Sequence, residues 1–230
     1  MIRTISIIFF LSIVSCNCFS QIEKAGFYPG KTTTLRTNPF TLLQTDAGIM
    51  VGVNRRWHQR WSATIDPKFI FYAVQAPGNS MDARSPLGIR LRTDIRYHIR
   101  KFLFGFENIF IAPEAVLGYV RTRSAAEFGI NCIGTNCAYY TIQQYTEIKK
   151  EAGGAIKVGL TGPIKKKNEN WKLELYSGLG ISFFDFDYKG IPAGGSFVRE
   201  PRQEDGLGTL DEDEPNIMIP FGLIITYRIK

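Results

Sequence analysis

The sequence predicts an all-β fold, an eight-stranded antiparallel up-and-down transmembrane β-barrel whose lumen is polar and filled by side chains. The first observation is the stretch 87–99, where apolar residues alternate with charged or small ones. A strand that crosses a bilayer at a tilt needs about 9–11 residues with this pattern. The second is that the alternation recurs along the chain without helical periodicity. The third is that no stretch beyond residue 20 reaches the about 18 apolar residues of a spanning helix, so strands would have to cross the membrane.

The first four strands are predicted before residue 100. In the first, Arg36 alternates with Leu35, and Pro39, which lacks a backbone N–H, brings the strand to an end or restricts it to an edge. In the next three, apolar side chains mostly occupy odd positions, while small, polar or charged ones occupy even positions. These four strands are expected over 31–40, 47–54, 61–73 and 87–99.

The last four strands are predicted after residue 108. In each, a face of aliphatic and aromatic residues alternates with a face of charges, hydroxyls or glycines. The final strand is the most regular, with an apolar residue at every odd position from Ile217 to Ile229. These four strands are expected over 109–122, 145–160, 171–186 and 217–229.

The connections between these strands alternate in length. Short turns are expected at 55–60, 100–108 and 162–170, and longer loops at 74–86, 123–144 and 188–215. Short periplasmic turns and long extracellular loops are typical of outer-membrane barrels. We therefore expect a periplasmic N-terminus and extracellular long loops.

Residues 1–20 predict a secretory signal peptide, because Arg3 precedes a short apolar run and small residues. Residues 21–230 would then form a single barrel domain in the bacterial outer membrane. Cys16 leaves open a lipoprotein signal instead. The formal net charge of +7 could suit nucleic acid, but an exported chain rarely meets it, so we expect outer-membrane lipid as a partner and no nucleic acid.

Two barrels fit the alternation, and they differ in which face points inward. A soluble or lipid-anchored lipocalin-like barrel would carry an apolar small molecule inside, whereas an outer-membrane barrel turns its apolar face to lipid. The polar face carries charges of both signs, and an eight-stranded barrel is just wide enough for side chains to fill it. We therefore predict an ionic network in the lumen; an anion site at its arginines is the alternative. The network comprises Asp66, Lys68, Arg90, Arg92, Asp94, Arg96, Glu114, Lys149, Glu151, Lys157, Lys172 and Glu174, and Arg36 lies on the same face.

Aromatic residues of the apolar face fall near the ends of the predicted strands. With strands alternating up and down, those nearest the periplasm would form a girdle at the membrane interface. This girdle comprises Trp61, Tyr97, Trp171 and Tyr227.

Several segments carry a resemblance to a known family. They are Phe19-Ser-Gln21, Leu35-Arg-Thr-Asn-Pro39, Arg96-Tyr97, Phe110-Ile-Ala-Pro-Glu114 and the closing Pro220-Phe-Gly-Leu-Ile-Ile-Thr-Tyr-Arg-Ile229. Over nearly all of residues 21–230 the chain resembles the small eight-stranded outer-membrane β-barrel proteins, OmpX-like in shape and of the Bacteroidetes type. One difference is Lys230, where that family usually ends in an aromatic residue. The resemblance implies assembly into the outer membrane and leaves the activity open.

Residues suited to catalysis or metal binding are few. His58 and His98 are expected at the periplasmic end, and no motif of a metalloprotease, serine hydrolase or phosphate loop occurs. We therefore predict no enzymatic activity, no cofactor and no metal site. An enzyme acting on lipid and calcium binding by the acidic loop 200–214 are the alternatives.

Cys132 and Cys137 are predicted to form a disulfide, since the periplasm is oxidising and no further zinc ligands lie nearby. Together these features predict a non-enzymatic outer-membrane protein with a structural or surface-interaction role. Its extracellular loops would contact an extracellular or envelope partner.

Overall fold

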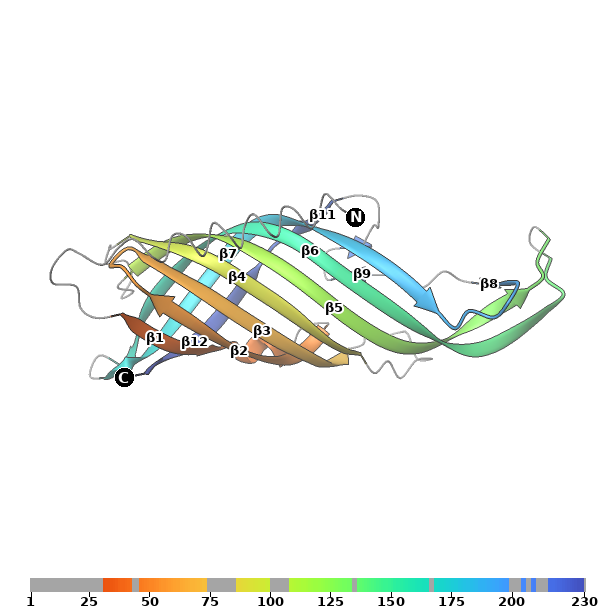
Figure 1. The fold of residues 1–230 in the computed structure, drawn as a ribbon, viewed down its shortest axis with the longest axis horizontal. Coiled ribbons are helices and arrows are strands. Elements are labelled where there is room, and N and C mark those ends of the chain that lie inside the picture. The colour runs from red at the N-terminus through yellow and green to blue at the C-terminus, as the bar shows by residue number, and fades with distance from the viewer. Residues whose placement is uncertain are drawn as a thin grey trace. The chain divides into compact units, whose positions relative to one another are not determined.

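The computed structural model describes residues 31–42, 46–73, 86–99, 108–133, 136–165, 168–198, 204–205, 208–209 and 215–229. Residues 31–230 form one compact unit, in which eight strands pair with antiparallel neighbours and close into a barrel (Figure 1). The predicted all-β class and the closed eight-stranded antiparallel barrel are therefore confirmed. The predicted signal peptide at 1–20 and Cys16 lie outside the described residues.

The barrel strands follow chain order around the wall, and β12 closes the circle between β7 and β1. Their bounds are β1 (Thr32–Thr37), β2 (Asp46–Arg56), β3 (Trp61–Ala73), β4 (Leu87–Ile99), β5 (Asn108–Ile130), β6 (Tyr139–Lys165), β7 (Asn168–Lys189) and β12 (Phe221–Ile229). A short strand β11 (Asn216–Met218) pairs with β7 in line with β12. The predicted strand 217–229 is thus interrupted at Pro220, which cannot donate a ladder hydrogen bond.

The wall between β2 and β12 contains a 3-10 helix, η1 (Pro39–Leu42). The predicted strand 31–40 stops at Thr37, and the buried Asn38 then accepts a hydrogen bond from Phe40 N through Oδ1 (3.0 Å). Thr41 Oγ1 donates to the backbone oxygens of Asn38 (2.7 Å) and Gly48 (2.8 Å). These bonds hold η1 against β2. The pairing of β1 with β12 ends at Thr37 and Ile225, and η1 follows next in the chain and contacts both β2 and β12.

Strands β5, β6 and β7 are longer than predicted. β5 and β6 stay paired from Ser124 and Tyr145 to Ile130 and Tyr139, and β8 (Gly195–Phe197) returns to pair with β5. We call the described residues of 124–145 and 187–198 the protrusion, which reaches beyond the other strands at the right of Figure 1. The predicted loops 123–144 and 188–215 are wrong where strands continue, over 123–130, 139–144, 188–189 and 195–197. The predicted turn 162–170 is too long, because β6 continues to Lys165 and β7 begins at Asn168.

The barrel has two unlike ends. At the short-turn end, β1 begins, β12 ends, and residues 57–60 join β2 to β3. The protrusion extends from the opposite end. A separate ladder pairs β9 (Glu204–Asp205) with β10 (Gly208–Thr209), while most of the predicted acidic loop 200–214 lies outside the described residues.

The apolar face of the strands points outward and the charged face points into the lumen. Ile156 and Leu179, which are paired neighbours, are each 64% exposed, whereas the adjacent Lys157 is 2% exposed. This is the reverse of the orientation that a lipocalin-like carrier requires. Within the described part of the chain, no helix is long and apolar enough to cross a membrane.

Candidate functional site

The lumen holds a central network of buried ion pairs. Its members come from six strands, and each is less than a tenth exposed. They are Arg36, Asp66, Asp94, Arg96, Glu114, Lys157 and Glu174. All except Arg36 belong to the network that the sequence predicts, and Arg36 was placed on the same face.

Glu174 joins the two arginines of the central network. Its Oε1 accepts a hydrogen bond from Arg36 Nη2 (2.9 Å), and its Oε2 accepts one from Arg96 Nη1 (2.7 Å). Arg36 Nη1 also lies 3.3 Å from Asp66 Oδ2, an ion pair without hydrogen-bond geometry. A single carboxylate of β7 therefore ties β1 to β4 across the lumen.

Lys157 joins two carboxylates at the other side of the same network. Its Nζ donates to Asp94 Oδ2 (2.6 Å) and to Glu114 Oε2. Asp94 Oδ1 in turn accepts from Arg96 Nε (2.7 Å). Because charges removed from water are costly unless they are paired, this closed set of contacts is what allows them to be buried.

A second network lies nearer the protrusion. Arg90 donates through Nε to Glu151 Oε2 (2.7 Å) and through Nη2 to Asp46 Oδ2 (2.9 Å). Lys149 Nζ is 3.7 Å from Asp46 Oδ2, and Lys68 is buried on the same face.

The two other residues of the predicted network are Arg92 and Lys172. Arg92 forms no ion pair with any residue that the structure describes. Lys172 lines a cavity at the short-turn end, below the central network.

Gly52 makes room for one carboxylate of the central network. A Cβ at this position would lie 1.9 Å from Asp66 Oδ1, so Gly52→Ala must displace Asp66 from Arg36. We expect the free energy of unfolding to fall by about 1–3 kcal/mol, the usual cost of overpacking. Urea unfolding in detergent micelles measures it.

Gly154→Ala is the matched control for this prediction. Its Cβ would meet only Glu114 O, at 3.5 Å, which is ordinary van der Waals contact. Equal unfolding midpoints for the two alanine variants would contradict the close packing at Gly52.

The lumen also contains an apolar cluster that the prediction of a polar filling missed. Its buried members are Met50, Phe110, Ala112, Tyr176 and Ile224. The guanidinium carbon of Arg96 lies 4.4 Å from the Phe110 ring centre, and Lys157 Nζ lies 5.0 Å from that of Tyr176. Aromatic faces attract cations, so the cluster packs against the network. The lumen filling is therefore mixed, with polar and apolar layers in contact.

The lumen histidine forms a pair with a serine. His98 Nε2 lies 2.8 Å from Ser62 Oγ, which also accepts a hydrogen bond from Asn54 Nδ2 (3.1 Å). Both residues are buried, and His98 Nδ1 has no hydrogen-bond partner among the residues that the structure describes, whereas a hydrolytic triad needs an acid there. His58 lies in the 57–60 turn and accepts from Arg60 N through Nδ1 (3.1 Å). The absence of enzymatic activity therefore stays a prediction.

The predicted girdle residues form two aromatic pairs on the outward face at the short-turn end. The rings of Trp61 and Tyr97 are 5.0 Å apart, and those of Trp171 and Tyr227 are 4.8 Å apart. Each pair joins directly opposed residues of neighbouring strands. Aromatic rings at such a rim suit the interface between lipid and water.

The protrusion has a small core of its own. Phe128, Ile130 and Tyr145 are buried there, and Tyr188 and Phe197 pack against them. The Phe128 ring lies 4.8 Å from that of Phe197 in the returning strand β8. This core explains why β8 folds back onto β5.

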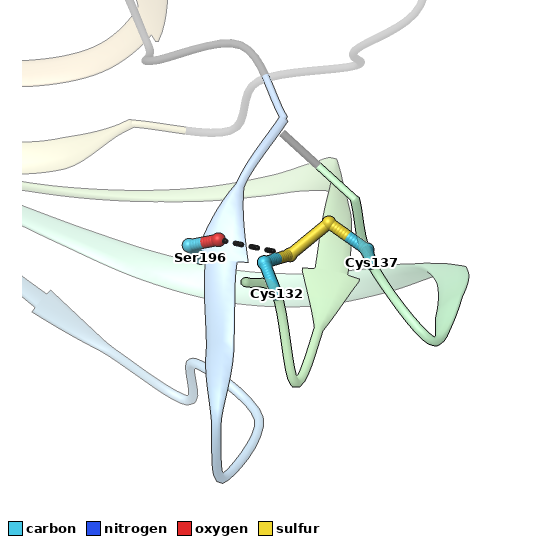
Figure 2. Close-up of a disulfide and its surroundings, with 3 residues drawn as sticks. All are labelled: Cys132, Cys137 and Ser196. Atoms are coloured by element: carbon cyan, nitrogen blue, oxygen red, sulfur yellow. Dashed lines mark hydrogen bonds between the residues drawn. A yellow bond between two sulfur atoms is a disulfide. The ribbon is translucent and has the colours of Figure 1, made fainter. Parts of the chain in front are cut away.

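The predicted disulfide between Cys132 and Cys137 is present at the tip of the protrusion (Figure 2). Ser196 Oγ of β8 points to Cys132 Sγ at 3.6 Å. Gly129 lies beneath the sulfurs, since a Cβ there would be 2.4 Å from Cys137 Sγ. The disulfide therefore lies against the paired strands and closes a small loop at the tip.

An apolar groove of about 580 Å³ lies on the outward face of β6, β7 and β12. Phe40 of η1 and Phe221 line it together with aliphatic residues of these strands, and Gly159 and Gly222 contribute to it as well. The groove therefore lies beside η1, the short helix that follows β1.

No protein-family model matches this chain, and no curated protein matches it. Among solved structures, a match is found to the crystal structure of a major outer membrane protein from Thermus thermophilus. The two chains are 14% identical with a TM-score of 0.45, and the match covers 88% of this chain and 100% of that one. At this identity and TM-score the match assigns neither a family nor an activity to this chain.

Proposed function

We propose that this chain is a non-enzymatic β-barrel protein of the bacterial outer membrane, and that its protrusion contacts a partner outside the cell. One observation carries the proposal: the same strands turn aliphatic residues outward and buried charges inward. Exposed apolar surface of this extent is unfavourable in water and favourable in lipid. A closed barrel also satisfies every backbone group within a bilayer.

The outward apolar band has an edge on each side. The aromatic pairs of Trp61 and Trp171 lie at the short-turn end. The edge toward the protrusion is marked by an exposed ion pair between Lys150 Nζ and Asp185 Oδ2 (2.7 Å). Asp185 lies two residues beyond the outward-facing Phe183 on β7. We assign the hydrocarbon layer to the surface between these edges, which leaves the protrusion in water.

The surface role rests on the build of the protrusion. It has a core and a disulfide of its own, while Tyr140 and Ile142 are 53% and 75% exposed. A preorganised surface loses little conformational entropy on binding, and exposed apolar side chains supply contact area. The protrusion is therefore suited to binding a macromolecular partner.

Cysteine labelling in intact cells tests the topology. A membrane-impermeant maleimide should label Ile142→Cys in intact cells, and should label Gln59→Cys in the 57–60 turn only after the outer membrane is permeabilised. The protein should also fractionate with the outer membrane and migrate faster on gels when unboiled. Recovery in a salt-extractable soluble fraction, or labelling of only Gln59→Cys in intact cells, would refute the proposal.

A further inference from the structure

The protrusion has one sheet edge with which none of the described residues pairs. Within the protrusion, β8 pairs with one side of β5, and β6 pairs with the other side (Figure 1). The far side of β6 pairs with β7 only from Thr146 onward, so residues 139–144 have no strand beside them within the described chain. We call residues 139–144 the β6 edge. We propose that it pairs with the same edge of a second copy of this chain.

The backbone groups that the β6 edge presents belong to its even residues, among them Tyr140 and Ile142. Val198 N donates to Glu127 O (3.1 Å), so the odd residues at this end of β5 direct their backbone groups to β8. The even residues of β5 therefore bond to the odd residues opposite them in β6. The even residues of the β6 edge point the other way, and such a row of N–H and C=O groups is a template for another strand.

The composition of the β6 edge suits pairing with an identical edge. Natural sheets protect their edges with charged residues or prolines, but residues 139–146 contain no charged residue, proline or glycine. Like charges directly opposite each other would destabilise a pair of identical strands, so the absence of charge removes that obstacle. Tyr139, Tyr140 and Ile142 are exposed apolar side chains of high β propensity, which a second copy would partly cover.

Two-fold symmetry determines the direction of the pairing. Identical edges present their backbone groups at the same positions, and antiparallel strands let these groups meet in a closed, isologous pair. Tyr140 of one copy then lies opposite Ile142 of the other, and Thr141 lies opposite itself. Because the two β6 strands run in opposite directions, the two barrels lie at opposite ends of the joined protrusions.

The antiparallel direction identifies where the second copy resides. This step rests on the proposed function, which places the protrusion outside the cell. Two barrels at opposite ends of the joined protrusions do not share one membrane, so each lies in a membrane of its own. The partner is therefore a copy of this chain on a neighbouring cell, and the pairing links the two cells.

Cysteine cross-linking of the full chain in maltoside micelles tests the pairing without a membrane. Directly opposed residues of antiparallel strands have Cα atoms about 4.5–5.5 Å apart, which is within the range of a disulfide. Thr141→Cys should therefore give a disulfide-linked dimer on oxidation, or Ile142→Cys should do so where the two-fold axis passes through that residue. Gln143→Cys is the matched control on the same strand, because residue 143 lies opposite a different residue in either register. The absence of a dimer from both test variants, or equal yields from all three, would overturn the proposal.

Ile142→Arg tests the pairing in the absence of a new cysteine. It brings two cations together at the joined edges, so it should weaken self-association in micelles, measured by sedimentation, at least tenfold. Val198→Arg is the control, because Val198 is exposed on the β8 side of the protrusion; it should weaken self-association by less than twofold. Folding of each variant is checked by its unboiled gel migration. Equal self-association of the two folded variants would refute pairing through the β6 edge.

Clustering of phosphatidylcholine vesicles tests whether the pairing links two membranes. Vesicles that carry the chain with the protrusion outside should cluster, as measured by light scattering, and those with Ile142→Arg should stay dispersed. Dimers in micelles without clustering of vesicles would overturn the link between membranes. A chain that stays monomeric at about 100 μM, well above a micromolar dissociation constant, would leave the edge to a strand of a different protein and overturn the inference. Maleimide labelling of Ile142→Cys in intact cells would then still support the proposed function, so the two failures are distinguishable.

Discussion

Lys157→Met is expected to lower the free energy of unfolding of the barrel by about 3–5 kcal/mol, the usual cost of breaking a buried ion pair. Lys157 is 2% exposed, and its Nζ contacts Asp94 and Glu114. Methionine keeps most of the volume but removes the charge, so Glu114 would be left buried without its cation. Asp94 would keep its contacts with Arg96.

Urea unfolding of the purified protein in micelles, followed by gel migration, measures this loss. Lys150→Met is the control, because Lys150 lies on the same strand but its side chain is 51% exposed and pairs with an exposed aspartate. Exposed pairs contribute little. The double variant Lys157→Met with Glu114→Gln should recover part of the lost stability, since it removes one uncompensated charge. Equal losses for Lys157→Met and Lys150→Met would contradict a buried network.

The barrel strands were predictable because each strand has one face in the polar lumen and one face on the apolar outer surface. A strand with one face in the lumen and one face outward must alternate in polarity, and a shift of one residue would invert every side chain. The predicted strands 61–73 and 87–99 accordingly coincide with β3 and β4.

The protrusion escaped prediction because the odd, outward face of β5 changes from apolar to polar as the strand leaves the barrel, where Arg121, Arg123 and Glu127 follow. Leu117 and Tyr119 point outward from odd positions, whereas Phe128 and Ile130 form the buried core of the protrusion from even positions. The apolar face that points outward in the barrel is therefore lost, while the even face stays buried into the protrusion. A pattern that follows the outward apolar face therefore ends near residue 122.

The partners within the lumen depend on which strands face each other across it. Alternation places Glu174 and Arg36 on the inner face, but their contact joins residues 138 apart in sequence. Strand stagger decides such contacts, and it follows from register rather than composition. For the same reason, the buried position of Phe110 could be predicted from its parity, but its contact with Arg96 could not.

Ile156→Arg is expected to destabilise the protein in bilayers by about 2–4 kcal/mol, the cost of a cation on the lipid face near the midplane. Ile142→Arg on the same strand should leave stability nearly unchanged. Both isoleucines are highly exposed, 64% and 75%, so neither substitution disturbs packing. Unfolding of the chain reconstituted in phospholipid vesicles measures the difference.

The two arginine variants distinguish a membrane barrel from a water-soluble one, because the two positions differ only in whether lipid or water surrounds them. In water, arginine replaces an exposed isoleucine at little cost at either position, so a soluble barrel would tolerate both changes equally. In a bilayer, only the position between the aromatic pairs and the Lys150–Asp185 pair lies in hydrocarbon. A cost at Ile142 equal to that at Ile156 would mean that the apolar layer extends over the protrusion. The absence of any cost at Ile156 would instead mean that the outward aliphatic face is not covered by lipid.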